Sequence, residues 1–274
     1  MNKKTETIKI YTENNDFQHA EVLKRNRTKR LQNKKFFIEG VKSINLAIEN
    51  NWEIDAFIYS SENQLSNWAK DILSKSLAKK HLEMPNELMA KLSDKENTSE
   101  LIALVGMKNN NLDRIEIKKD LFLVVIDRAS NPGNLGTILR SCNSFNVDAV
   151  IMTGHSVDLY DPKTVQASVG TIFSIPVIRL ESHNDLLPWI EKIKSKLEDF
   201  TVIGTTAKTE KTIDTEDIKK PLMLLIGNET HGLSTNYKDI CDKLVKIPIS
   251  GSASSLNVAC ATSICLYEIN RKNS

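Results

Sequence analysis

The sequence feature that most constrains the fold is a series of short apolar runs in the second half of the chain. The run LFLVVI, at residues 121–126, is followed by DAVIMTG, SIPVIRL, FTVIGTT, PLMLLIGN and KLVKIPI. Each is too short for an ordinary helix and is typical of a strand that is buried on both faces. Most are separated by helical stretches, namely NLGTILRSCNSFN, NDLLPWIEKIKSKLED and SLNVACATSICLYEINRK. This alternation predicts an α/β domain over residues 120–274, with a parallel sheet of five or six strands covered on both sides.

The first part of the chain predicts a second, smaller α/β domain. FFIEG, IDAFIYS and LIALVGM are typical of strands, and residues 16–32, VKSINLAIENN and LSNWAKDILSKSLAKK are typical of helices. In VKSINLAIENN we expect one face to carry Val41, Ile44, Leu46 and Ile48. The polar, Asn-rich stretch KNNNLDRIEIKK predicts a linker at residues 108–119. We therefore expect two domains, 1–107 and 120–274, which suits a chain of 274 residues.

Composition excludes some classes of protein and leaves others open. The formal net charge of +2 is too small to identify a partner. No apolar run approaches the roughly 20 residues that span a bilayer, and the start of the chain lacks the apolar segment of a secretory signal. The four cysteines form no CxxC pair and predict free thiols in a reducing cytosol. We expect a cytoplasmic protein that binds neither a membrane nor a metal.

A basic stretch near the N-terminus is the strongest local charge signal. Seven basic residues and no acid fall within residues 24–35: Lys24, Arg25, Arg27, Lys29, Arg30, Lys34 and Lys35. On a helix they would attract a phosphate backbone, with binding that weakens steeply as salt rises. A solvated helix face is the alternative.

Three loops lie at the expected carboxyl ends of strands in the second domain, where open α/β sheets bind ligands. The first, DRASNPGNLGTILRSC, has a glycine-bearing turn, but its spacing is not the G-x-G-x-x-G of dinucleotide sites. The second, LLIGNETHGLS, holds Glu229 between two glycines, where it meets a ligand or solvent. In the third, IPISGSASSLNVAC, Ser254 or Ser255 can cap the helix that follows, and the same helix start can present N–H groups to a ligand.

Taken together and in this order, the loops resemble the SpoU class of the SPOUT RNA methyltransferases. That class carries N-P-x-N-x-G-x-I-x-R, then G-x-E-x-x-G-L, then I-P-x-x-G-x-x-x-S-L-N-V. In this chain the three patterns stand at Asn131–Arg140, Gly227–Leu233 and Ile247–Val258. The N-terminal part is similar to the ribosomal-protein-like RNA-binding domain of several members, with FFIEGVKSINLAIENN as its first strand and helix.

The resemblance implies an α/β SPOUT domain with a deep trefoil knot, a homodimer whose active site uses both subunits, and S-adenosylmethionine as cofactor. The implied reaction is methylation of a ribose 2′-hydroxyl in structured RNA, with ribosomal RNA as the expected substrate and transfer RNA as the alternative. The implied cofactor contacts are Gly204, Thr205, Gly227, Ile247 and Leu256. From the charge of the basic stretch we expect Arg25, Arg27, Lys29 and Arg30 to contact RNA phosphates.

The resemblance also implies roles in catalysis. Arg140 would align the ribose and stabilise negative charge developing on its oxygen. Asn134 would fix Arg140 or the RNA backbone, and Glu229 would orient Arg140 across the site. Ser255 and Asn257 would hold the third loop and contact RNA. Two other classes stay open, a non-catalytic RNA-binding protein on the same scaffold and a nucleotide-dependent oxidoreductase.

Overall fold

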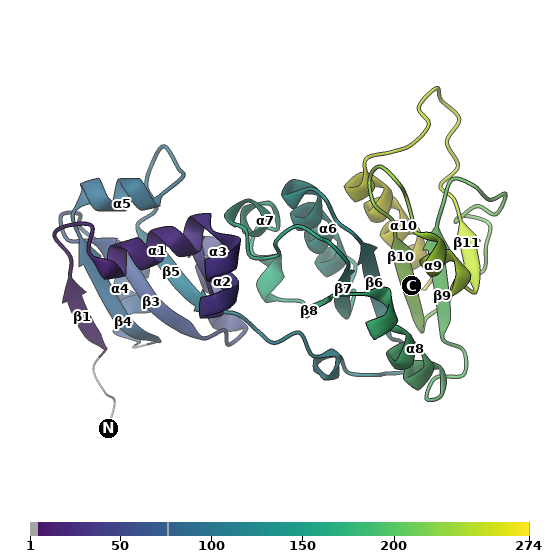
Figure 1. The fold of residues 1–274 in the computed structure, drawn as a ribbon, viewed down its shortest axis with the longest axis horizontal. Coiled ribbons are helices and arrows are strands. Elements are labelled where there is room, and N and C mark those ends of the chain that lie inside the picture. The colour runs from purple at the N-terminus through teal and green to yellow at the C-terminus, as the bar shows by residue number, and fades with distance from the viewer. Residues whose placement is uncertain (1–4, 76, 274) are drawn as a thin grey trace. The chain divides into compact units, whose positions relative to one another are not determined.

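The computed structural model describes residues 5–75 and 77–273, which form two compact units. Unit 1 comprises residues 1–108 together with 158–174, and unit 2 comprises residues 109–157 and 175–274. Figure 1 labels the helices and strands of both. The segment 158–174, which the domain prediction assigns to the second domain, therefore packs with the first 108 residues.

Unit 1 is built on a five-stranded mixed sheet in the order β1-β4-β3-β5-β2. β1, β4 and β3 run parallel, and β5 runs antiparallel to both β3 and β2. The strands are β1 (Glu6–Lys9), β2 (Lys35–Glu39), β3 (Ile54–Ser60), β4 (Ala78–Met84) and β5 (Leu101–Gly106). The helices are α1 (Asn15–Arg25), α2 (Arg27–Asn33), α3 (Val41–Glu49), α4 (Asn67–Ser74), α5 (Asn86–Leu92) and α7 (Pro162–Ala167), with the 3-10 turn η2 (Thr171–Phe173).

The structure confirms the three strands predicted in this unit and corrects three details. The prediction of a single basic helix is wrong, because α1 and α2 are separate helices that meet at Asn26. The Asn26 N–H donates to the Val22 carbonyl at the end of α1, and the Asn26 side chain accepts from the Lys29 N–H at the start of α2. The helix predicted over residues 65–80 ends at Ser74, and its last residues belong to strand β4. On α3, Ile44 is buried as expected, but Val41 is 53% exposed.

An aromatic cluster joins the two sequence segments of unit 1. The ring centroids of Phe36 and Tyr160 are 4.4 Å apart, and those of Trp52 and Phe173 are 5.2 Å apart. The Trp52 indole N–H also donates to the Phe173 carbonyl over 3.0 Å. Aromatic side chains bury large areas, so these contacts contribute strongly to holding segment 158–174 in place.

Unit 2 has a six-stranded sheet in the order β11-β9-β10-β6-β7-β8, with every neighbouring pair parallel. The strands are β6 (Phe122–Asp127), β7 (Ala149–Thr153), β8 (Val177–Leu180), β9 (Thr201–Thr205), β10 (Leu222–Ile226) and β11 (Lys243–Val245). The helices are α6 (Pro132–Ser144), α8 (Leu187–Lys194), α9 (Thr235–Asp239) and α10 (Val258–Lys272), with 3-10 turns η1 (Leu112–Arg114) and η3 (His183–Asp185). All six apolar runs are thus strands of one parallel sheet, as predicted.

The middle strands and the predicted linker share the core of unit 2. Every residue of β6 and β10 is buried, which explains their continuous apolar sequences. Ile115, within the predicted linker at 108–119, is buried in the same core. Within the described part of the chain, no helix is long and apolar enough to cross a membrane.

Candidate active site

A cavity of about 370 Å³ opens at the carboxyl ends of three parallel strands of unit 2. Its wall includes the last residue of each strand and the residues that follow it, namely 205–208 at β9, 226–233 at β10 and 245–247 at β11, together with residues 254–256 from the loop before α10. This is the position where open α/β sheets bind ligands. Four of the five predicted cofactor contacts line it, namely Thr205, Gly227, Ile247 and Leu256.

The fifth predicted contact, Gly204, is absent from the residues that line this cavity. It lies within β9, and a Cβ atom there would be 2.5 Å from the Cys241 Sγ atom and 2.8 Å from a methyl group of Leu244. Glycine at this position therefore serves the close packing of Cys241, which follows α9, and of Leu244 on β11 against the strand.

Gly227 has no room for a side chain because the loop behind it folds back. A Cβ atom would lie 2.1 Å from the Leu233 backbone nitrogen and 2.2 Å from the Gly232 carbonyl carbon. Two backbone hydrogen bonds between Asn228 and Gly232, of 3.1 and 2.9 Å, close this loop. The loop 227–233 therefore presents a fixed backbone to the cavity.

A chain of hydrogen bonds joins the three sequence motifs. The Asn257 amide donates to Asn134 Oδ1 over 3.1 Å, and the Asn134 amide donates to Glu229 Oε1 over 3.3 Å. Glu229 Oε2 accepts from the Ser130 hydroxyl over 2.5 Å and from the Asn228 amide over 3.3 Å. Asn134, Glu229 and Asn257 were predicted as site residues, whereas Ser130 and Asn228 were not. Ser130 directly precedes the first motif and Asn228 stands inside the second, which is the signal that could have found them.

Glu229 is held as a carboxylate by this network. Its partial burial alone would raise its pKa, but hydrogen bonds from Ser130 and Asn134 outweigh burial and bring the pKa below the ordinary glutamate value. Near neutral pH the side chain is thus a hydrogen-bond acceptor that fixes the first and second loops against each other.

Arg140 lies on the exposed side of α6 and apart from this network. Within the described residues, its side chain makes no hydrogen bond or ion pair, whereas Glu229 accepts hydrogen bonds from Ser130 and Asn134. The predicted interaction between Arg140 and Glu229 is therefore not made within one copy of the chain.

The third loop is held by Asn257 rather than by a serine. The Asn257 side chain caps α10 by accepting from the N–H groups of Ala259 and Cys260, over 2.9 and 3.3 Å. The prediction that Ser254 or Ser255 caps this helix is wrong, and both serines instead line the cavity. Asn257 thus ties the start of α10 to the first motif through Asn134.

The cysteines are thiols without disulfide bonds. Cys265 lines the cavity, and burial raises its pKa to about 12, as it also does for Cys241. The described residues contain no cluster of three or more His, Cys, Asp or Glu side chains that could hold a metal ion.

The basic stretch in unit 1 is partly neutralised by carboxylates. Arg30 is only 2% exposed, and its guanidinium binds Asp158 over 2.7–2.8 Å and the carbonyls of Leu23 and Lys24. The prediction that Arg30 contacts RNA does not fit this burial. Lys24 is also buried and pairs with Asp94.

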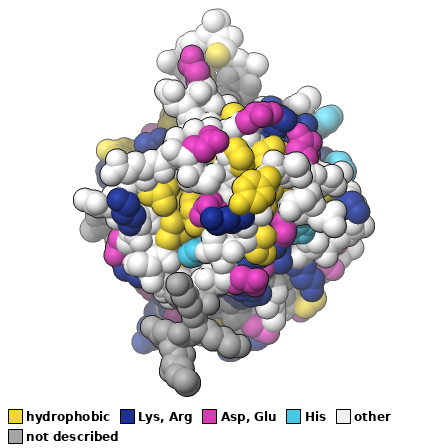
Figure 2. Space-filling view, turned by 90° about the vertical axis from the view of Figure 1, so that its left-hand side faces the viewer, with side chains coloured by type: hydrophobic (Ala, Val, Ile, Leu, Met, Phe, Trp, Pro, Cys, Tyr) yellow, Lys and Arg dark blue, Asp and Glu magenta, His cyan; other side chains and the backbone are white. Residues whose placement is uncertain are grey.

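The other predicted RNA contacts are more accessible. Arg25 and Lys29 are exposed and Arg27 is partly exposed, with Arg25 paired to Glu21 on the same helix. Figure 2, which views the side of the molecule where β1 and β4 lie, shows lysine and arginine side chains interspersed with acidic ones rather than a surface of one sign.

Two family models match the chain. The SpoU rRNA Methylase family matches residues 121–267, and the SpoU L30e-like domain matches residues 14–103. Among curated proteins, a 23S rRNA (uridine(2479)-2′-O)-methyltransferase from Streptomyces viridochromogenes is 37% identical over 265 residues, which cover 96% of this chain and 92% of that protein. A 23S rRNA (guanosine-2′-O-)-methyltransferase from Escherichia coli is 30% identical over 61% of this chain and 67% of its own length.

Solved structures give the same result for the whole chain. The SpoU methyltransferase AviRb from Streptomyces viridochromogenes, in complex with the cofactor AdoMet, is 37% identical, with a TM-score of 0.89 over 94% of this chain and 97% of that one. An AdoMet-bound rRNA methyltransferase from Sinorhizobium meliloti is 25% identical, with a TM-score of 0.87 over 97% of this chain and 98% of that one.

Proposed function

Since the chain belongs to the SpoU rRNA Methylase family, we propose that it transfers the methyl group of S-adenosylmethionine to a ribose 2′-hydroxyl of 23S ribosomal RNA. One observation carries the assignment to chemistry rather than to RNA binding alone. The three sequence motifs meet at one cavity, where Glu229, Asn134 and Asn257 are joined by hydrogen bonds. A protein that only binds RNA does not need this arrangement.

The cavity residues fit the proposed cofactor. Ile226, Ile247 and Leu256 offer apolar surface to an adenosine group, and the bare backbone at Gly227 allows close approach. When bound, the cofactor supplies an electrophilic methyl group, and the protein supplies position and proton removal. We assign Thr205, Gly227, Ile247 and Leu256 to cofactor binding and leave Gly204 out, because its role is packing.

Arg140 is the proposed residue for the ribose. A ribose hydroxyl is a poor nucleophile while it is protonated, so negative charge on its oxygen must be stabilised as the proton leaves. An arginine stays positively charged, which suits it to that task and not to acting as a base. Ser255, at the cavity edge, and Asn257, which holds the third loop, complete the proposed catalytic set with Asn134 and Glu229.

We further propose a homodimer in which Arg140 acts at the active site of the second copy. Arg140 is exposed and makes no hydrogen bond to its own chain's network, and α6, which carries it, packs on α10. On α10, Ile264 and Tyr267 are 40% and 58% exposed, an apolar surface that a second copy can cover. Sedimentation at assay concentrations should give two chains per particle, and a fully active monomer would overturn this part of the proposal.

The N-terminal part is the proposed RNA-binding part, with residues 1–107 selecting the target and 120–274 performing the reaction. The accessible residues Arg25, Arg27 and Lys29 are its proposed phosphate contacts.

We propose a uridine as the target. The uridine-modifying relative matches 96% of the chain, including the N-terminal residues, whereas the guanosine-modifying relative matches 61%. We also propose a cytoplasmic enzyme, and we propose that its chain follows the trefoil knot of the family around the cavity.

The test combines cofactor binding with product mapping. S-Adenosylmethionine should raise the melting temperature of the protein and NAD should not. Tritium from the labelled cofactor should pass to unmethylated 23S rRNA transcribed in vitro. Mapping of 2′-O-methyl groups in rRNA from cells with and without the gene should then locate one uridine. Cofactor binding without transfer to any RNA would reduce the protein to a binding module.

A further inference from the structure

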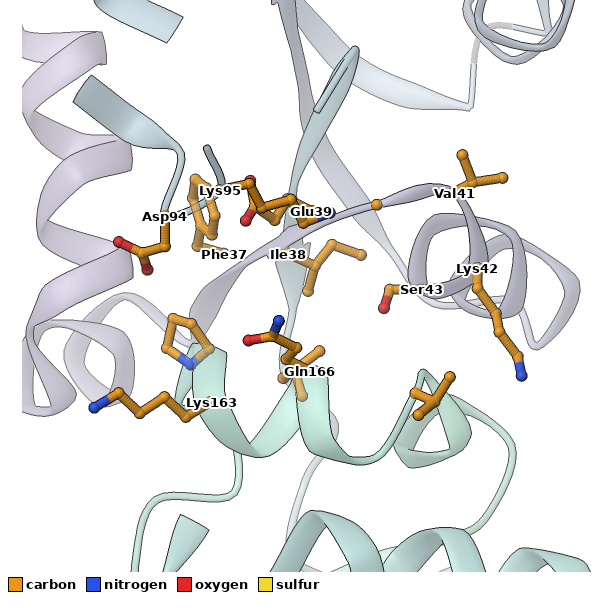
Figure 3. A pocket seen from close by; sticks show the side chains of 14 residues that line it. Phe37, Ile38, Glu39, Val41, Lys42, Ser43, Asp94, Lys95, Lys163 and Gln166 are labelled. Carbon is orange, nitrogen blue, oxygen red and sulfur yellow. The ribbon is translucent and has the colours of Figure 1, made fainter. Parts of the chain in front are cut away.

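A buried carboxylate ends strand β6, outside the three motifs. Asp127 is the one polar residue in the strand sequence FLVVID, and it is only 4% exposed. It belongs to unit 2, whereas the cavity of about 470 Å³ in Figure 3 belongs to unit 1 and is lined by no motif residue. A buried charge is costly unless it is paired, so the partners of Asp127 indicate what it does.

The Asp127 carboxylate joins two segments of backbone. Its two oxygens accept from Nε and Nη2 of Arg128, each over 2.9 Å. Asp127 Oδ2 also accepts from the Ser234 N–H over 3.0 Å. Ser234 directly follows the second motif, Gly227–Leu233, and is the N-cap of α9. One carboxylate therefore holds both the start of the first loop and the end of the second.

Arg128 has a backbone conformation that few residues other than glycine adopt. Its φ is +55°, in the left-handed region. Its N–H donates to the Thr153 carbonyl over 3.1 Å, and a Cβ atom at Gly154 would lie only 3.0 Å from its Cγ. Such a conformation persists where the surrounding structure holds it, and the paired hydrogen bonds from the guanidinium to Asp127 supply that hold.

The turned backbone of Arg128 fixes the Asn228 side chain. The Arg128 carbonyl accepts from the Asn228 amide over 2.8 Å. Asn228 Oδ1 accepts from the N–H groups of Thr230 and His231, over 2.9 and 3.1 Å. The same amide donates to Glu229 Oε2 over 3.3 Å. Asn228 therefore connects the first loop to the second at the point where Glu229 stands.

The starting point of this series of contacts lies on strands and a helix. Asp127 on β6 is in register with Thr153 on β7. The buried Tyr237 of α9 donates its hydroxyl to Thr153 Oγ1 over 2.8 Å, and burial raises the pKa of Tyr237 to about 12, which keeps it a donor near neutral pH. Groups that are held by regular elements place a site more accurately than groups on loops.

We infer that Asp127 and Arg128 are positioning residues for methyl transfer, which act through Asn228 on the Glu229 carboxylate. Neither of the two lines the cavity at β9–β11. The inference rests on the proposed function, in which Glu229 is a catalytic residue. The Arg128 side chain is 36% exposed, so direct contact between its guanidinium and RNA is the competing explanation.

The first test is a double-mutant cycle with the full-length protein, an unmethylated 23S rRNA transcript and single-turnover tritium transfer. Asp127→Asn keeps the shape of the side chain and removes its charge. It should slow transfer roughly 10- to 100-fold, the effect of misplacing a group at the site, while cofactor affinity stays near wild type. In a Glu229→Gln background the same change should alter the rate by less than about twofold, because the group that Asp127 positions is gone.

Asp148→Asn is the matched control for Asp127→Asn. Asp148 lies at the opposite end of β6, where it accepts from the Phe122 N–H over 2.8 Å and pairs with Lys118 over 2.8 Å. Its substitution should lower the melting temperature of the protein and leave the transfer rate unchanged. Equal slowing by the two substitutions would mean that Asp127 acts only on the stability of the sheet.

The second test compares Arg128→Gly with Arg128→Ala. Both remove the guanidinium, but glycine adopts a positive φ freely and so leaves the carbonyl facing Asn228. The alanine variant should therefore transfer tritium about tenfold more slowly than the glycine variant. Asn146→Ala, at another left-handed position with φ +53°, should lower the melting temperature and keep the wild-type rate.

The outcomes separate this inference from the proposed function. Equal rates for the two Arg128 variants would show that the conformation of its backbone does not matter, and weaker RNA binding by both in a filter assay would assign the guanidinium to RNA. Either result overturns the inference, as would independent losses from Asp127→Asn and Glu229→Gln in the cycle, and the proposed function would stand. If the wild-type protein transfers no tritium to the transcript, the proposed function fails first.

Discussion

Substitution of Gly227 by alanine should separate cofactor binding from folding. The new Cβ atom would lie 2.1 Å from the Leu233 nitrogen, and ordinary contact begins at 3.4 Å. Both clashing groups are backbone, so no side chain can turn away, and the loop must retreat by more than 1 Å. Overpacking of this kind costs roughly 1–3 kcal/mol, and a backbone clash belongs near the upper value.

The cost should fall on binding, since the free loop can relax into a shifted position. The cofactor then has to restore the native wall, and about 3 kcal/mol corresponds to roughly 100-fold weaker affinity. Isothermal titration with S-adenosylmethionine measures this, with circular dichroism as the check on folding. The matched control is Gly251→Ala, in the third loop, where nothing lies within 4 Å of the added Cβ; its affinity should stay within about twofold of wild type. Equal affinities for the two variants would show that loop 227–233 does not form the cofactor wall.

Three further substitutions test other parts of the molecule. Arg140→Ala should abolish tritium transfer while cofactor affinity measured by titration stays near wild type, and wild-type turnover would remove Arg140 from the mechanism. Glu229 has a folded-state pKa below its ordinary value, so its stabilisation is present above that value and lost as pH falls through the folded pKa. The melting temperature of Glu229→Gln should therefore decline less on acidification than that of wild type. An equal decline in the two proteins would show that the hydrogen bonds to Glu229 do not stabilise the fold. Arg30→Gln leaves Asp158 without its buried partner, so the free energy of unfolding should fall by about 3–5 kcal/mol and the melting temperature of unit 1 by roughly 6–20 °C. The control Arg25→Gln, at an exposed ion pair, should not show this loss.

The parallel sheet of unit 2 could be predicted from sequence because each strand is apolar throughout. Strands of unit 1 with mixed composition could not. β4 reads AKKHLEM, and its lysines continue the helical spacing of the preceding segment until pairing with β3 makes it a strand. β1 has four residues and depends on β4, which is more than 70 residues away. Such pairing is long-range and leaves no local signal.

Site residues that stand in local motifs could be predicted from sequence, whereas roles that depend on residues far along the chain could not. Glu229 and Asn134 stand in recognisable motifs, so their meeting at one cavity could be predicted. The resemblance implies Gly204 as a cofactor contact, but a glycine that admits a ligand and a glycine that admits a neighbouring side chain look alike in sequence. Arg30 was assigned to RNA because its partner, Asp158, lies 128 residues further along the chain.

The packing of residues 158–174 with the first 108 has a consequence for how such enzymes can be recombined. A fragment cut at residue 108 would leave Phe36 and Trp52 facing water and the Arg30 guanidinium without its carboxylate. A chimera between two relatives that exchanges only the N-terminal part would set one parent's aromatic surface against the other parent's Tyr160 and Phe173. A workable exchange needs crossovers at three places, near residues 108, 158 and 174, so that the segment inside the catalytic half is inherited together with the half that precedes it.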